Sequence, residues 1–142
     1  MLSAPQIGVR HTRRLKGTGA VLRADWPRGT ACADEIGVSP AVSPKFPNIS
    51  IPYGALVPAR LDGLLACGRH ISCDRNSHGF MREIPQCWIT GQAAGVAAAL
   101  AVAHNVEPRA VDVTALQAAL LGQGVYLRAQ AASAVAPVAI AA

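Results

Sequence analysis

Aromatic side chains are scarce in this chain, and charged side chains are few. Phe, Trp and Tyr make up 4% of the 142 residues and charged residues 15%, whereas 51% of the residues are hydrophobic. This balance is typical of a folded, single-domain chain and excludes a disordered one. Because alanine is abundant and aromatic residues are not, we expect a core of small side chains whose backbones approach one another closely.

Acidic residues are also in deficit. The chain has 13 Lys and Arg against 8 Asp and Glu, a formal net charge of +5. Part of the excess lies in the run "RHTRRLK" at residues 10–16. No aromatic residue is interleaved with this run to stack on bases, and charges of both signs are scattered elsewhere. The composition therefore argues against a nucleic-acid partner.

Two further absences bear on the compartment. No apolar leader follows Met1, and the only cysteines are Cys32, Cys67, Cys73 and Cys87. A disulfide framework of the secreted kind is not expected from this pattern. We therefore expect reduced thiols in a cytoplasmic protein.

No Asp, Glu, Lys or Arg occurs between Ile84 and Val106. Gly91 and Gly95 form the small-xxx-small spacing of packed transmembrane helices, so a membrane span is one interpretation. The stretch nevertheless opens with a proline, is rich in alanine, and contains four polar residues: Gln86, Thr90, Gln92 and His104. These features favour a buried helix in a soluble protein, without membrane contact.

Glycine and proline divide the chain into three segments. Residues 1–50 are rich in Gly, Pro and Arg, with short strand-like pieces such as "GAVLRA" and a loop, "VSPAVSPKFPN". Residues 51–127 carry the readable secondary structure. Residues 128–142 form an alanine-rich tail of low complexity that we expect to be disordered.

Within the middle segment the pattern predicts a strand, a loop and two helices. Leu64–Cys67 does not alternate in polarity, which is typical of a strand buried on both faces. A polar loop then covers residues 69–83. The first helix starts near Pro85 and ends at Asn105. The second is capped by Asp112 and stops at Gly122. The fold class is therefore α/β, in the sense of a mixed α+β fragment with short buried strands and a helix packed on the sheet.

The first helix has two different faces. Gly91, Ala94, Gly95 and Ala98 fall on one side, and Ile89, Ala93, Val96 and Leu100 on the other. Glycine in a helix costs about 1 kcal/mol relative to alanine, so two of them indicate that a strand or a ligand passes close to the backbone. A ligand at a strand end and a helix start would be anionic or rich in acceptor oxygens.

The chain resembles a known family in several motifs. The stretch "IPYGALVPARLDGLLACGRHIS" followed by "SHGFMREIPQCWITGQAAGVAAALA" is similar to the C-terminal part of FAD-dependent oxidoreductases. The resemblance extends upstream through "IGVRHTRRLKGTGAVLRAD" and downstream through "LQAALLGQG", covering residues 6–126. Where the family commonly has a different loop, this chain has "SCDRNSHGF", which leaves the substrate open.

The resemblance implies the C-terminal part of a two-domain flavoprotein that completes an FAD site. Residues 1–50 would be a partial substrate-side segment, and 51–127 would complete the site. By position, Gly68 and Arg69 match the strand end beside the cofactor. The matching helix residues are Gly91, Gln92, Ala93, Ala94 and Gly95. The N-terminal dinucleotide-binding half would be a missing partner, and Met1 an internal start.

Two residues are candidates for catalysis next to a flavin. Arg82 matches an arginine of the family pattern, and a guanidinium there suits a carboxylate or an oxyanion. His78, like His70, could serve as acid or base. The plainer interpretations stay open: an Arg82 paired with Glu83 or Asp74, and histidines that only donate or accept hydrogen bonds. Arg10, Arg13 and Arg14 match upstream family arginines but suit a solvated strand end equally well.

Two rival functions are considered. Cysteine and histidine are dense enough to suggest a small zinc module, although we expect no metal; the candidate ligands are Cys67, His70, Cys73, His78 and Cys87. An iron–sulfur cluster lacks a C-x2-C-x2-C run. The other rival is a non-catalytic fragment, because no G-x-G-x-x-G follows a strand and "GTGAVL" fails at its last position.

Overall fold

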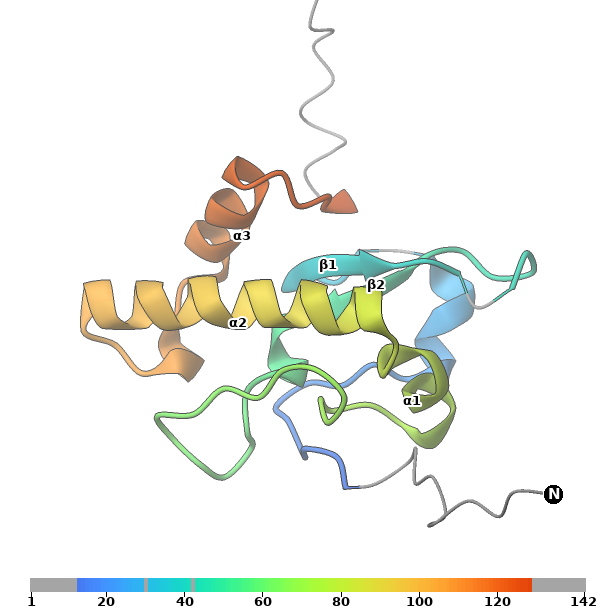
Figure 1. Ribbon diagram of the computed structural model, residues 1–142, viewed down its shortest axis with the longest axis horizontal. Coiled ribbons are helices and arrows are strands. Elements are labelled where there is room, and N and C mark those ends of the chain that lie inside the picture. The colour runs from blue at the N-terminus through green and yellow to red at the C-terminus, as the bar shows by residue number, and fades with distance from the viewer. Residues whose placement is uncertain (1–12, 30, 42, 129–142) are drawn as a thin grey trace, which may run out of the picture.

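The computed structural model describes residues 13–29, 31–41 and 43–128. In these residues the fold is mixed α+β, as expected, with a two-stranded antiparallel sheet and a long central helix (Figure 1). In chain order the elements are η1 (Arg23–Arg28), β1 (Glu35–Ser39), β2 (Ile49–Pro52), η2 (Tyr53–Ala55), α1 (Arg75–Met81), α2 (Ile84–His104), η3 (Pro108–Ala110) and α3 (Val113–Gly122), where η denotes a 3-10 helix.

The sheet is a hairpin of β1 and β2 that α2 covers directly. Gly37 lies opposite Ile51 and Ser39 opposite Ile49 in the antiparallel register. A Cβ added at Gly37 would lie 2.2 Å from Cγ2 of Ile89, so this glycine leaves the space into which the α2 side chain packs. Neither strand follows from the sequence pattern, because the pairing joins segments on either side of a long loop.

Both ends of α2 are where the sequence places them. The helix runs from Ile84 to His104 with Pro85 in its first turn, a position where the missing N–H costs nothing. Asn105 ends the helix in the left-handed conformation, with φ of 50°. The two punctuating residues therefore define 21 residues of helix correctly.

The buried face of α2 is not the one expected. It is lined by residues three or four apart: Gln86, Thr90, Ala93, Ala97 and Ala101. Ile89, Val96 and Leu100, expected to face the core with Ala93, are only partly buried along its border. Alanine at the centre of the face lets the helix backbone approach its neighbours, and the larger side chains fill the angle beside it.

The segment expected as a loop at 69–83 contains a helix. Asp74 caps α1, accepting a hydrogen bond from the Ser77 N–H at 2.7 Å on Oδ1, and its Oδ2 accepts one from the Arg23 N–H at 2.7 Å. Seven residues give too short a periodic pattern to be recognised, although the N-cap aspartate is a signal of the right kind. The loop interpretation was wrong for residues 75–81.

The strand expected at Leu64–Cys67 is absent from the described residues. These residues have no regular secondary structure, and a backbone hydrogen bond runs from the Ala66 N–H to the Leu56 carbonyl at 2.9 Å. Leu64 is 47% exposed instead of buried on both sides. No neighbouring strand lies beside this segment in the part of the chain that the structure describes, and a strand needs a ladder partner.

Residues 13–29 add isolated bridges and an aromatic cluster rather than a strand. The piece "GAVLRA" contributes one bridging residue, Val21, which pairs with Cys73, and then enters η1. Trp26 of η1 donates from Nε1 to Ser77 Oγ at 3.1 Å, and its ring makes edge-on contacts with Phe46 and Phe80. The few aromatic residues thus join η1 to α1.

The third helix ends as expected, and the chain stays fixed beyond it. Asp112 Oδ1 caps α3 by accepting from the Thr114 N–H at 2.9 Å, and Gly122 is the last helical residue. Arg128, expected in the disordered tail, is half-buried and binds the fully buried Glu35 carboxylate, with Nη2 at 3.1 Å from Oε2. Arg128 is therefore not part of a disordered tail, and residues 129–142 lie outside the described residues.

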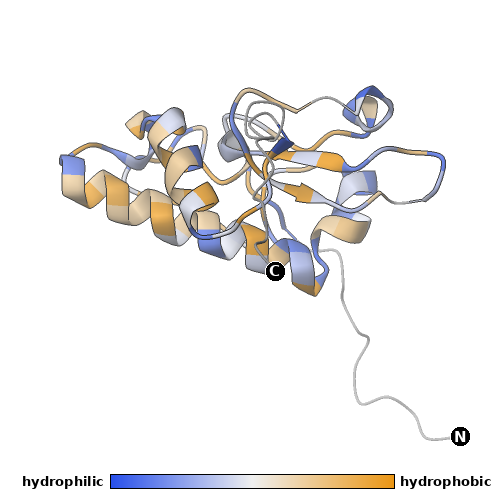
Figure 2. Cartoon of the chain, turned by 90° about the horizontal axis from the view of Figure 1, so that it is seen from above, coloured by the Kyte–Doolittle hydropathy of each residue, from blue (hydrophilic) through white to orange (hydrophobic). Residues whose placement is uncertain are grey.

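By length and composition α2 is apolar enough to cross a membrane, the only such helix among the described residues. Figure 2 shows hydrophobic colours along most of its length. Its two most polar inward residues are buried: Gln86 donates to Ser39 Oγ at 2.9 Å, and Thr90 donates to the Gln86 carbonyl at 2.9 Å. The Oε1 of Gln86 has no hydrogen-bond partner among the described residues. A core helix that packs one face against a sheet has the same length and composition.

Replacing Asp74 by alanine should destabilise the fold. Burial on its own would raise the pKa of Asp74, but the N–H groups of Ser77 and Arg23 hold it below the ordinary value of 3.8. We expect Asp74→Ala to lower the free energy of unfolding at pH 7 by about 1 kcal/mol, the contribution of an N-cap. A lowered carboxyl pKa stabilises the fold above the unfolded-state pKa, so the difference from wild type should shrink as the pH falls below about 4.

Urea denaturation at several pH values measures this difference. Asp62→Ala is the matched control, because Asp62 is 69% exposed and pairs only with Arg109. Equal stability of Asp74→Ala and wild type at pH 7 would contradict the capping role.

Candidate functional site

The predicted strand end meets α2 at Thr90. Gly68 has φ of 81°, a conformation that favours glycine, and its N–H donates to Thr90 Oγ1 at 3.0 Å. The same hydroxyl donates to the Gln86 carbonyl of its own helix. The turn at residue 68 is therefore fixed to the second turn of α2 by a buried side chain that sequence reasoning did not include. Polar residues four apart in a charge-free helix, Gln86 and Thr90, were the available signal.

The backbone of Arg69, the next residue, is bound by a side chain of α1. His78 is 2% exposed, and its Nε2 lies 2.8 Å from the Arg69 carbonyl oxygen. The Arg69 side chain itself is exposed. His78 thus fixes the backbone at residue 69, and its ring has little direct access to solvent.

Arg82 lies between α1 and α2, mostly buried. Its side chain is 17% exposed, and Nη2 lies 3.2 Å from Glu83 Oε1, so the plainer expectation of pairing with Glu83 is confirmed. Pairing with Asp74 is not seen among the interactions of the described residues. Nε is buried and has no hydrogen-bond partner among them. A buried donor without an acceptor costs about 1–3 kcal/mol, so this N–H is unusual.

Cys87 joins these residues into one corner. Its thiol donates to the Arg82 carbonyl at 3.6 Å, and a Cβ at Gly68 would lie 4.0 Å from its Sγ. Burial raises the pKa of Cys87, and the nearby Arg69 charge opposes that rise. We call Gly68, Arg69, Arg82 and Cys87 the α2-start corner. Three of these four were predicted from the sequence.

The predicted helix residues separate into different environments. Gly91 and Gly95 are open: a Cβ added at either would meet nothing within 4 Å. Ala94 is partly buried, Gln92 donates to Gln123 Oε1 at 2.9 Å, and Ala93 faces the core with 0% exposure. The structure therefore brings Gly91 and Gly95 to one surface and Ala93 to the opposite one.

This surface lies inside the helix rather than at its start. Gly91 is the eighth residue of α2, which begins at Ile84, so its N–H belongs to the helical ladder. The positive end of the helix dipole lies at the α2-start corner, about two turns before Gly91. What the glycines offer is bare backbone, not unpaired donors.

Large apolar residues flank the glycines on the same helix face. Ile84 is 63% exposed, Trp88 73% and Val102 82%. With Gly91 and Gly95 they follow the three- and four-residue spacing of one face. We call these five residues the open face of α2. This face is apolar, with large side chains at both ends and only the two glycines between them.

The predicted zinc ligands do not gather. Among the described residues, which include all five of them, no three His, Cys, Asp or Glu side chains lie together in a way that could hold a metal ion. Cys73 is buried, which raises the pKa of its thiol to about 11, and His78 binds the Arg69 carbonyl. This arrangement gives the zinc module no ligand set.

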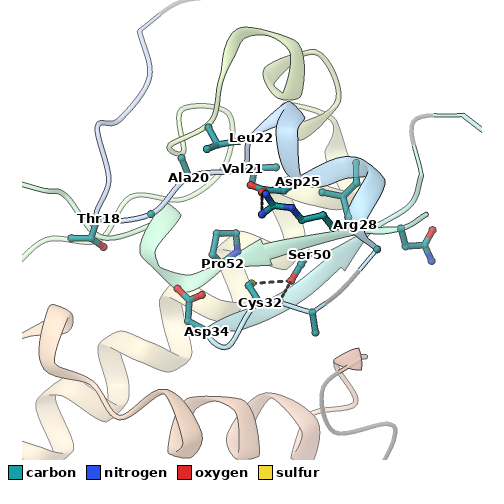
Figure 3. A pocket seen from close by; sticks show the side chains of 15 residues that line it. Thr18, Ala20, Val21, Leu22, Asp25, Arg28, Cys32, Asp34, Ser50 and Pro52 are labelled. Atoms are coloured by element: carbon teal, nitrogen blue, oxygen red, sulfur yellow. Dashed lines mark hydrogen bonds and ion pairs between the residues drawn. The ribbon is translucent and has the colours of Figure 1, made fainter. Parts of the chain in front are cut away.

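A hollow of about 490 Å³ lies elsewhere, between η1, residues 18–22 and β2 (Figure 3). None of the predicted site residues lines it; its polar wall includes Cys32, Asp34 and Ser50. Sequence reasoning missed these residues because they meet only through the β1–β2 pairing.

A family model described as FAD dependent oxidoreductase matches residues 2–120 of the chain. No curated protein and no solved structure gives a significant match.

Adding a methyl group at the open glycines should stabilise the chain. Gly91→Ala and Gly95→Ala each remove backbone freedom from the unfolded state without a clash, and we expect each to raise the free energy of unfolding by up to about 1 kcal/mol. Gly54→Ala is the contrasting control, because its Cβ would lie 2.7 Å from the Gly19 nitrogen. Urea denaturation measures the unfolding free energy of each variant. A loss of stability in Gly91→Ala would mean that another part of the chain packs on this face.

Arg82 should be dispensable for stability. Arg82→Met removes the unpartnered Nε–H while keeping the apolar length of the side chain, and we expect unfolding free energy unchanged or slightly raised. Arg128→Met removes the cation beside the buried Glu35 carboxylate and should cost about 3–5 kcal/mol. Thermal unfolding of both variants tests the contrast, and an Arg82→Met variant as unstable as Arg128→Met would make Arg82 a structural residue.

Proposed function

The chain belongs to the FAD-dependent oxidoreductase family, and we propose that it supplies the flavin-contacting strand end, loop and helix of such an enzyme. The reaction would be transfer of a hydride or an electron pair between FAD and a small-molecule substrate. FAD supplies that redox chemistry when bound, and the chain supplies binding, orientation and charge.

One observation carries this proposal: the bare backbone at Gly91 and Gly95. Two glycines in the middle of a helix cost stability, and no described residue of the chain occupies the space that they leave. A planar ring that packs against a helix needs such a surface. Trp88, three residues before Gly91 on the same helix face, is an exposed aromatic side chain that suits the face of a flavin, so the residues present fit the group.

The α2-start corner supports the same proposal. It lies at the positive end of the α2 dipole, and it carries Arg69, whereas the charge of Arg82 is paired with Glu83. Positive charge suits a cofactor that becomes anionic when it is reduced. The unpartnered Nε–H of Arg82 is a donor for which the described residues provide no acceptor, which suits an acceptor supplied by cofactor or substrate.

We propose different roles for the two predicted catalytic residues. Arg82 would orient an anionic or carbonyl-bearing substrate and stabilise negative charge on it. The acid or base role predicted for His78 stays a prediction. Its burial and its bond to the Arg69 carbonyl support a positioning role, in which it holds Gly68 and Arg69 against α2.

The cofactor's pyrophosphate would need a second protein part. The sequence has no G-x-G-x-x-G, and the described residues hold one antiparallel hairpin instead of a parallel βαβ unit. We propose that a dinucleotide-binding half, in the same or another chain, covers the open face and the Leu64–Cys67 segment. The four cysteines are free thiols, which supports a reducing, cytoplasmic location.

Flavin binding tests the proposal. FAD is titrated into the purified chain, alone and mixed with the dinucleotide-binding half of a family member, while quenching of flavin fluorescence is followed. We expect binding in the mixture, and we expect Gly91→Leu and Gly95→Leu to weaken it by about tenfold or more, or about 1.4 kcal/mol, because their side chains fill the open face.

Ala103→Leu is the matched control, because it adds the same bulk at an exposed position of α2 outside the open face. It should bind like wild type. Absence of binding in both arms, or an equal effect of all three leucines, would contradict the proposal.

A further inference from the structure

The hollow beside β2 is a built cavity that the flavin proposal does not use. Its volume of about 490 Å³ lies within the range of small-molecule sites. Its apolar lining residues include Val21, Leu22, Ile49 and Pro52. Figure 3 shows part of the polar lining, where Cys32 is hydrogen-bonded to Ser50 of β2 and Asp34 lies to one side of this pair.

The charge of the hollow opposes that of the chain. Its charged lining residues are Asp25, Arg28 and Asp34, a sum of −1, whereas the whole chain carries +5. Arg28 Nη1 pairs with Asp25 Oδ1 at 3.0 Å on the rim, so the uncompensated charge is that of Asp34. Asp34 Oδ2 accepts the Gly54 N–H at 2.9 Å, which fixes the carboxylate in place.

The remaining polar groups of this wall are acceptors and neutral donors. Ser50 donates to the buried Glu35 carboxylate, whose charge Arg128 compensates, and it accepts the Cys32 N–H at 3.1 Å. The Cys32 thiol lies 2.9 Å from the same hydroxyl. Burial raises the pKa of Cys32 to about 11, so the thiol is neutral at pH 7. At pH 7 the Cys32 thiol is therefore a neutral group of this wall.

We propose that this hollow binds a small organic ammonium ion, a protonated amine that bears an apolar substituent. The ammonium group meets the Asp34 carboxylate, and the substituent packs against the more accessible apolar lining residues Leu22 and Pro52. The Asp34 carboxylate beside apolar lining residues favours a ligand of this class. An anion is disfavoured because Asp34 repels it, and a neutral alkyl alcohol gains no ion pair. The site is independent of the flavin proposal.

Three probes of equal size separate these classes. The 142-residue chain is titrated at pH 7 with n-butylamine, n-butanol and butyrate, and amide chemical shifts are followed by NMR. We expect butylamine to shift the amides of Gly19, Asp34 and Ser50 and to bind about three- to fivefold more tightly than butanol, the range of a solvent-accessible ion pair. Butyrate should bind most weakly.

Two variants assign the charge. Asp34→Asn keeps an oxygen for the Gly54 N–H and should reduce the preference for butylamine over butanol to about one. Asp25→Asn, at a rim residue with a 46% exposed side chain, should weaken butylamine binding without affecting folding. Asp62→Asn, whose carboxylate pairs with Arg109, is the control and should leave binding unchanged. Equal binding of the three probes, unaltered preference in Asp34→Asn, or shifts scattered over exposed acidic residues would overturn the proposal.

Discussion

The close packing of α2 on β1 is the contact on which the rest of the fold depends. Because Gly37 has no side chain, Ile89 of α2 occupies the space above the strand. Ala93 and Ala97 are buried and small, so the α2 backbone lies close to the core. Few large aromatic side chains are available to fill space between α2 and the sheet, so the helix packs close to the strand. The contact also carries polar bonds: Gln86 of α2 donates to Ser39 of β1.

This packing makes the two faces of α2 unequal. Small residues on the inner face are explained by the nearby strand, but Gly91 and Gly95 on the outer face serve no contact in the described residues. Together they cost about 2 kcal/mol relative to alanine, a substantial part of the 5–15 kcal/mol that stabilises a typical domain. A cost of this size with no internal benefit is best explained by something outside the described residues that approaches the helix backbone.

The sequence predicts what is encoded locally. Pro85 and Asn105 give the ends of α2, and Asp112 gives the start of α3, because each acts on backbone groups within a few residues. The hairpin of β1 and β2 is missed because its pairing spans a loop with no regular pattern. Leu64–Cys67 reads as a strand from its composition, yet a strand exists only when a neighbour supplies hydrogen bonds.

The candidate site, like the fold, was predicted only in its local features. Periodicity places Gly91 and Gly95 together on one surface, as the structure does, but it does not decide which flank of the helix is buried. The turn of α1 was hidden inside a polar segment, so the burial of His78 was not foreseen. The hollow beside β2 was invisible, because Cys32 and Ser50 meet only across the hairpin.

The segment from Gly68 to Arg82 is held by hydrogen bonds as well as by the burial of Ile71 and Met81. Thr90 holds Gly68, His78 holds Arg69, and Asp74 ties the start of α1 to η1. Each of these bonds satisfies a backbone group of the segment or of its neighbour η1. Arg82 follows it with a buried Nε–H that no described residue satisfies. Gln86 Oε1, in the first turn of α2, is a second buried polar atom without a partner among the described residues. Two such atoms at the start of one helix are costly, and under our proposal the Arg82 donor would meet an acceptor on the cofactor or the substrate.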